Sequence, residues 1–203
     1  KLQLYPQSQT ATLLPNSYNS SDKFTVPETV AYDGVTYTVT ALSDECFYGC
    51  TTLQSVILPN TIKIIGNNCF YYCSSLTTIN IPEGVTALGD YCFESCSALT
   101  TINIPEGVTA LGDYCFSNCS ALSFLEIPES VKSIGSSCFR SCNTLQENGI
   151  IINSTTPPTL LGDISMNRIY VPEEAVETYK ANESWKNKTI SKIDDFHYVD
   201  IEV

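Results

Sequence analysis

Cysteine is the residue in this sequence with the greatest chemical potential, because a thiol can form a disulfide, bind a metal ion or act as a nucleophile. The 203-residue chain holds 10 cysteines. They form two columns that recur every 23 positions, namely Cys46, Cys69, Cys92, Cys115 and Cys138, and Cys50, Cys73, Cys96, Cys119 and Cys142. A phenylalanine follows each member of the first column. This repetition limits which of the three chemistries is possible.

Structural free thiols fit this pattern better than reactive ones. Each column has five members, so pairing along a column leaves one cysteine over. Two cysteines four residues apart on one helical turn also lack the geometry of a strain-free disulfide. A buried free cysteine instead behaves as a small hydrophobic side chain. We therefore expect mostly free thiols, with some disulfides between repeats and a metal site of four thiolates as the alternatives.

A catalytic site needs titratable groups that converge, and the sequence offers few of them. Its single histidine, His197, has no nucleophile motif around it, and ten equivalent cysteine nucleophiles would serve no reaction. The phosphate-binding, dinucleotide-binding and zinc-protease motifs are absent from the sequence. We expect a protein that is not an enzyme and has no catalytic residue, no cofactor and no metal.

The acidic composition narrows the possible partners. With 22 Asp and Glu against 10 Lys and Arg, the net charge of −12 argues against nucleic acids and anionic membrane surfaces. Acidic residues recur at Glu83, Glu106 and Glu129 and at Asp90 and Asp113. A Ca²⁺ site needs about six oxygens close together, so solvated rows of carboxylates are the simpler interpretation. We expect no membrane-spanning segment. The chain starts at Lys1 without a signal segment, so we expect a processed or trimmed product whose signal or lipid anchor is absent from this chain.

The elements that position these residues follow from the same period. Leucine recurs with the cysteines, at Leu53, Leu76, Leu99, Leu122 and Leu145, and the 18 residues from 76 to 93 reappear unchanged from 99 to 116. Self-similarity at a fixed period of this length indicates a solenoid. One unit cannot bury its apolar side alone, so stacked units must share one continuous core.

One unit combines a strand, a second apolar segment and a turn. Ile79, Asn80 and Ile81 alternate as in a half-buried strand, which Pro82 then ends. Val85 and Leu88 continue the apolar wall through an extended or turn segment. Gly89 is expected where the backbone needs positive φ or passes close to its neighbour. The segment from Asp90 to Cys96 is expected to be a single helical turn that carries the chain back.

The two flanks do not follow the 23-residue repeat pattern and are expected to cap the array. Residues 1–38 form an N-terminal cap, with an edge strand (Leu2 and Leu4, then Ala11 to Leu14), a mobile loop that ends near residue 22, and a hairpin from Ala31 to Tyr37 that turns at Asp33-Gly34. Residues 39–152 hold five repeats, and the last apolar strand covers Glu147 to Ile152. Residues 153–203 form a C-terminal cap and tail, with a strand from Arg168 to Val171 and a helix from Glu173 to about Asn182. Trp185 is expected to dock just beyond this helix. The end from His197 to Val203 either adds a strand or is a free tail.

The repeat pattern resembles a known family. The sequence L-x-x-I-x-I-P-x-x-V-x-x-I/L-G-x-x-C-F-x-x-C is similar to the 23-residue class of leucine-rich repeats in BspA-like bacterial surface proteins, although the first cysteine of the pattern is more often alanine there. The ending Ile169-Tyr-Val-Pro172, Tyr179-Lys180 and Trp185 also resembles that family's terminal segment. The resemblance implies one right-handed α/β solenoid domain, a leucine-rich repeat array with a parallel strand layer, a β-hairpin cap and a strand/helix cap. It also implies an extracellular or cell-surface location and adhesion to a protein ligand such as a host extracellular or matrix protein.

The outward side of the strand layer is the predicted binding surface. Its candidates flank the buried residue of each strand: Ser55, Ile57, Thr78, Asn80, Thr101, Asn103, Phe124 and Glu126. We expect only this face to present aligned positions across repeats, with Ile57 and Phe124 as apolar anchors. The alternative is that these are ordinary strand residues repeated by duplication. The predicted function is a monomeric, non-enzymatic protein-binding or adhesion module, and the alternatives are a structural spacer or a glycan-binding module.

Overall fold

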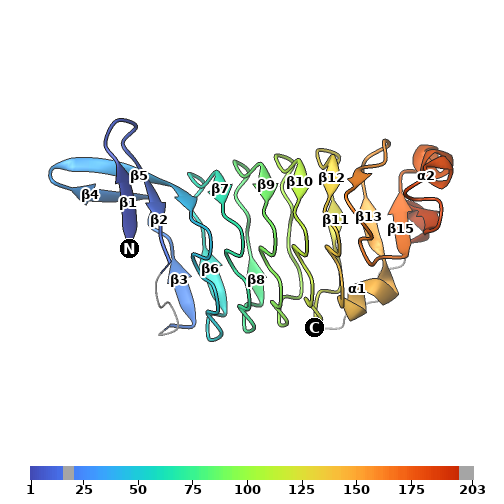
Figure 1. Cartoon of the computed structure of the whole chain (residues 1–203), viewed down its shortest axis with the longest axis horizontal. Helices are drawn as coiled ribbons and strands as arrows, with labels where there is room; N and C mark the ends of the chain where they lie inside the picture. Colours follow the sequence, from blue (N-terminus) through green and yellow to red (C-terminus); the bar gives the residue numbers. More distant parts are fainter. Residues whose placement is uncertain (16–20, 197–203) are drawn as a thin grey trace.

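The computed structural model describes residues 1–15 and 21–196, and these residues form a parallel-strand solenoid of about seven turns with little helix (Figure 1). The turns stack side by side along one axis, from the N-terminal hairpins to the C-terminal helices. The predicted leucine-rich repeat solenoid with its parallel strand layer is therefore confirmed. The division into 1–38, 39–152 and 153–203 stays a prediction.

Most repeats contribute two short strands, which follow two lines along the solenoid, named here the first and the second ladder. Each ladder is divided between two sheets, and in the first ladder the isolated parallel bridges of Asn80 with Asn103 and of Thr101 with Phe124 link them. The first ladder contains β3 (Lys23–Thr25), β6 (Ser55–Ile57), β8 (Thr78–Ile79), β11 (Glu126–Ile127), β13 (Ile150–Ile152), β15 (Arg168–Val171) and β16 (Thr189–Lys192). The second contains β5 (Val35–Leu42), β7 (Ile64–Ile65), β9 (Ala87–Leu88), β10 (Ala110–Leu111), β12 (Ser133–Ile134) and β14 (Thr159–Leu160). The apolar segment that follows each strand proline is thus a short strand. Neither β14 nor β16 was predicted.

The third side of each repeat is a pair of tight turns, so the prediction of a helical turn is wrong. Tyr91 and Ser95 have positive φ angles of 57° and 61°. Two such residues in one unit interrupt the α-helical backbone. The backbone N–H groups of Tyr91 and Ser95 instead donate to the next repeat, to the carbonyls of Asp113 and Ser117, both at 2.8 Å. Backbone hydrogen bonds that would close a helix here join neighbouring repeats.

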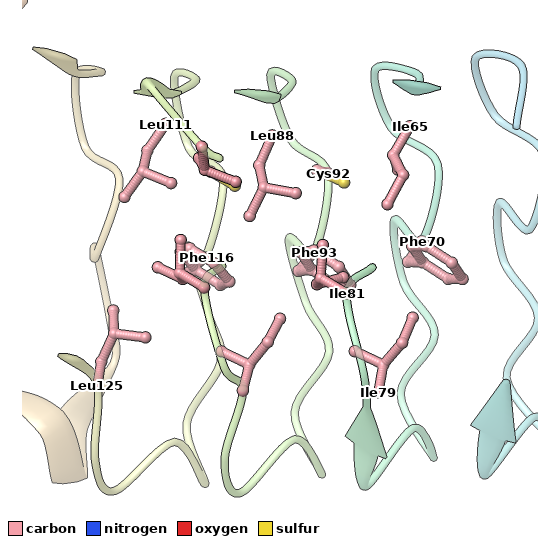
Figure 2. Close-up of a cluster of buried hydrophobic side chains, with 14 of the residues drawn as sticks. Ile65, Phe70, Ile79, Ile81, Leu88, Cys92, Phe93, Leu111, Phe116 and Leu125 are labelled. Atoms are coloured by element: carbon pink, nitrogen blue, oxygen red, sulfur yellow. The ribbon is translucent and has the colours of Figure 1, made fainter. Parts of the chain in front are cut away.

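The core is a set of buried columns that run along the solenoid axis. Figure 2 shows Phe70, Phe93 and Phe116 in line between the isoleucines of the first ladder and the leucines of the second. Successive phenylalanine rings from Phe47 to Phe139 stack almost in parallel, with centroids 5.2 to 6.1 Å apart. The five rings are fully buried. The repeated Phe and Leu of the sequence therefore form the shared core that a solenoid requires.

The two cysteine columns belong to this core. All ten cysteines are buried and free, so the prediction of free thiols is confirmed. Four thiols of the second column each donate a hydrogen bond to the phenylalanine carbonyl of the preceding repeat. The sulfur–oxygen distances are 3.1 Å for Cys73 to Phe47, Cys96 to Phe70 and Cys119 to Phe93, and 2.9 Å for Cys142 to Phe116. The same carbonyls also accept the backbone N–H of the cysteine three residues later, at 3.1 to 3.2 Å. The thiol therefore adds a second hydrogen bond to a buried carbonyl, which an alanine could not supply.

The N-terminal cap contains two hairpins. β1 (Leu2–Tyr5) and β2 (Thr10–Leu13) pair antiparallel, and β2 then lies parallel to β5. The predicted single edge strand is therefore two strands, because the chain reverses between residues 6 and 9. The second hairpin, β4 (Thr29–Tyr32) with β5, turns at Asp33 and Gly34 with positive φ angles of 49° and 74°, as predicted. The predicted mobile loop falls largely on residues 16–20, outside the described residues.

The C-terminal cap covers the last repeat with short helices. α1 (Asn143–Asn148) precedes β13, so the predicted strand begins at Ile150 and Glu147 is helical. β15 has the predicted bounds, and the predicted helix is a 3-10 turn, η1 (Glu173–Ala175), that continues into α2 (Val176–Ala181). Trp185 is buried, as predicted, and its ring N–H donates to the carbonyl of Pro158 at 2.9 Å. The predicted end from His197 lies outside the described residues.

Candidate functional site

The eight residues predicted for binding lie on one face, formed by the outward side chains of the first ladder and named here the strand face. They form two rows along the solenoid: Ser55, Thr78, Thr101 and Phe124, and Ile57, Asn80, Asn103 and Glu126. β-Sheet register pairs Ser55 with Thr78, Asn80 with Asn103 and Thr101 with Phe124. The pairing between repeats therefore aligns equivalent side chains of successive repeats in rows.

Most of the strand face is open to solvent and polar. Thr78, Asn80, Thr101, Asn103 and Glu126 are exposed. Ile57 is an exposed apolar side chain, with 63% of its surface accessible, whereas Ser55 is half-buried. The buried neighbours Ile79 and Ile102 point to the core and leave hydroxyls, amides and one carboxylate outside. This arrangement can donate and accept hydrogen bonds along its length.

Phe124 differs from its prediction as an open apolar anchor. Its ring lies 5.7 Å from the ring of Phe196, which meets Tyr170 edge-on at 4.9 Å. Phe196 follows the 3-10 turn η2 (Ile193–Asp195), and this segment covers the C-terminal end of the strand face. With this segment in place, Phe124 is half-buried and not an open apolar side chain. Phe196 carries no repeat signal, so the sequence did not indicate this contact.

A shallow hollow of about 170 Å³ opens on the strand face beside this aromatic contact. Its lining combines Asn103, Glu106, Glu126 and Asn153 with Ile104 and Pro128. The amide of Asn153 donates to the Glu126 carboxylate at 2.6 Å and holds it in place. Asn153 was missed because it follows the last regular repeat, and Glu106 was seen only as part of an acidic row. The hollow can accept a hydrogen-bonding or cationic group.

The strand face is not the only aligned surface, so that expectation is wrong. The second ladder pairs Ala87 with Ala110 and Ala110 with Ser133 and presents them outward, at exposed or half-buried positions. Ile64, on the same side, is 62% exposed. A stack with a constant period aligns every outward position of the unit, whatever its side. Alignment alone therefore does not select a binding surface.

The thiols have the properties of core residues. Burial raises the pKa of Cys73 and of Cys142 to about 12, and it raises the pKa of Cys96 and Cys119 well above the ordinary value. These groups stay protonated near neutral pH, and a protonated thiol is a poor nucleophile and metal ligand.

In the described part of the chain, no three His, Cys, Asp or Glu side chains are grouped so that they could hold a metal ion. No helix there has the length and hydropathy to span a bilayer.

Comparison with known proteins identifies the repeat. The sequence matches the model of a BspA type leucine-rich repeat region, in six copies, over residues 35–156. The solved T. pallidum leucine-rich repeat protein TpLRR is 20% identical with a TM-score of 0.62, and the match covers 92% of this chain and 89% of TpLRR. A leucine-rich repeat protein from Bacteroides ovatus is 20% identical with a TM-score of 0.56, and the match covers 86% of this chain but only 58% of that protein.

These two structural similarities establish the fold alone, because their sequence identities are low. A comparison with curated proteins found no match. The family match, in contrast, spans more than half of the sequence and includes the strands from β5 to β13 and both cysteine columns. The chain therefore belongs to the BspA-type leucine-rich repeat family.

Proposed function

We propose that the protein is a non-enzymatic protein-binding module of the adhesion type, which acts as a monomer at a bacterial cell surface or after secretion. Its partner binds along the strand face. The observation that carries the proposal is the register of the two rows, which sets polar side chains of successive repeats beside one another. The surface location rests on family membership.

The physical basis of binding is a rigid polar surface with a few distinct features. Backbone pairing between repeats fixes the rows before a partner arrives, so little conformational entropy is lost on association. Ile57 offers an exposed apolar contact at one end. The hollow beside Glu126 and Asn103 offers a polar contact at the other. The nearby carboxylates of Glu83, Glu106 and Glu129 act on the association rate more than on affinity.

A binding screen with paired variants tests the proposal. The chain is first screened against host matrix proteins and glycans, and each hit is then measured with the double variant Thr101→Lys, Asn103→Lys. Both side chains point to solvent, so the fold should be preserved while protein capture is lost. The matched control is Thr86→Lys, Ala87→Lys, which adds the same charge at two exposed positions, Ala87 in β9 and Thr86 just before it, and should bind normally.

Four outcomes would contradict the proposal. A partner that binds the strand-face variant with unchanged affinity, and loses binding only when the turns or the C-terminal cap are altered, would place the site elsewhere. Equal loss in both variants would indicate a general charge effect. A chain that captures only glycans would be a glycan-binding module, and one that captures nothing from a broad panel would be a spacer.

A further inference from the structure

The turn side of the solenoid carries a group of tyrosines that the strand-face function does not use. Five of them come from consecutive repeats and are named here the tyrosine band: Tyr48, Tyr71, Tyr72, Tyr91 and Tyr114. The rings of Tyr48 and Tyr71 stack at 4.8 Å, and those of Tyr91 and Tyr114 stack at 5.1 Å. Tyr48 and Tyr72 are nevertheless 52% and 51% exposed. Exposed aromatic side chains held in fixed positions are typical of binding surfaces.

The backbone beneath the tyrosine band is ordered by contacts between repeats. The N–H of Tyr72 donates to the carbonyl of Glu94 at 2.8 Å, and the N–H of Tyr91 donates to that of Asp113 at 2.8 Å. Asp90 adds a side-chain link, because its carboxylate accepts the N–H of Asp113 at 2.8 Å. Neither the turns nor the stacked rings need to be rearranged when a partner binds, which lowers the entropic cost of association.

Carboxylates accompany the tyrosine band. Asp44, Glu45, Asp90, Glu94 and Asp113 come from the same turns, and none of them forms an ion pair with another described residue. Glu94 occupies the position of Tyr71 in the next repeat. Partial burial and then the charge of Glu94 raise the pKa of the Tyr71 phenol. Arg140, two repeats beyond Glu94, is the nearest cation of this column. The surface is therefore aromatic and negatively charged.

These observations favour one kind of ligand. We propose that the tyrosine band is a second binding site, separate from the strand face, that takes an arginine-containing segment of a protein partner. A guanidinium group stacks on an aromatic ring and at the same time pairs with a carboxylate, so it satisfies both features of this surface. The carboxylates of the same turns favour a cation over a neutral sugar at this surface. The site is independent of the proposed strand-face function.

The test uses a short peptide of alternating Arg and Gly as the probe and the full chain as the receptor, with affinity measured by calorimetry. The variant Tyr48→Leu, Tyr72→Leu removes the two most exposed rings of the band without changing the net charge. Each ring lost should weaken binding roughly two- to five-fold. Glu94→Gln should weaken it as well. Circular dichroism of each variant establishes that the fold is kept.

Matched controls separate this site from the general acidity of the chain. Tyr32→Leu removes a 65% exposed ring from β4, and Glu83→Gln removes a carboxylate beside the strand face; both should leave the affinity unchanged. The strand-face variant Thr101→Lys, Asn103→Lys should reduce the affinity for the peptide only as much as the variant Thr86→Lys, Ala87→Lys does, because both add the same charge. Unchanged affinity of the Tyr48, Tyr72 variant, or an equal loss with Tyr32→Leu, would overturn the proposal. So would the discovery that the band binds a glycan and not the peptide.

Discussion

Replacement of Gly112 by alanine should weaken the stack between two repeats of identical sequence. A Cβ atom at this position would lie 2.5 Å from the nitrogen of Asp90 and 2.5 Å from the carbonyl carbon of Gly89. Ordinary contact begins near 3.4 Å, so the two repeats would have to separate locally by about 0.9 Å. These two atoms belong to the backbone and cannot rotate aside. The sequence offered two reasons for glycine at this position of the unit, and close approach is the correct one.

The magnitude follows from what this separation disturbs. The N–H of Gly112 donates to the carbonyl of Leu88 at 2.9 Å, and the next N–H, of Asp113, donates to the Asp90 carboxylate at 2.8 Å. Overpacking of a well-packed site costs about 1–3 kcal/mol, and each weakened hydrogen bond costs about 0.5–1.5 kcal/mol. We therefore expect the free energy of unfolding to fall by roughly 2–6 kcal/mol.

Gly84→Ala is the matched control for this substitution. Its Cβ would meet nothing closer than the carbonyl oxygen of Ile62 at 3.2 Å. The change should stay within about 1 kcal/mol, because a small local shift is offset by the lower entropy of the unfolded chain. Urea unfolding followed by circular dichroism measures both variants against the wild type. Equal stability of Gly112→Ala and Gly84→Ala would refute the argument that the repeats approach too closely for a side chain.

The other predictions concern the core and its thiols. Leu99→Ala should lower the free energy of unfolding by roughly 2–5 kcal/mol, because Leu99 is fully buried, whereas Thr78→Ala should change it by less than about 0.5 kcal/mol; similar losses in urea unfolding would mean that the faces are inverted. All ten thiols should react in denaturant without reductant, and a thiol count of two or fewer would show that disulfides form. Stability should fall at alkaline pH: the pKa of Cys73 is about 12 in the folded chain against 9.0 for a free thiol, so its contribution is complete below 9.0 and is lost as pH rises towards 12. Cys73→Ala should make unfolding midpoints less dependent on pH over this range, and an unchanged dependence would contradict that assignment.

The candidate site was predictable wherever the repeat code held. Thr101 and Asn103 could be placed outward because they flank a buried isoleucine in a period of two. Phe196 and Asn153 could not, since both come from the C-terminal cap and reach the strand face only through the path of the chain. The tyrosine band was also missed, although its residues are plain in the sequence. The turn was predicted to be helical, and binding was predicted on one side of the solenoid only.

The sequence by itself determined the solenoid, its period, the columns that fill its core and the free state of its thiols. A strict repeat does so because every unit must bury the same apolar side against an identical neighbour, which leaves one way to stack. The tertiary structure decided the conformation of the turns, the cover over Phe124 and the surfaces that stay open. These depend on hydrogen bonds between repeats and on where the caps end, and such contacts join residues that have no fixed spacing in the sequence. For that reason the periodic core was predictable and much of the surface was not.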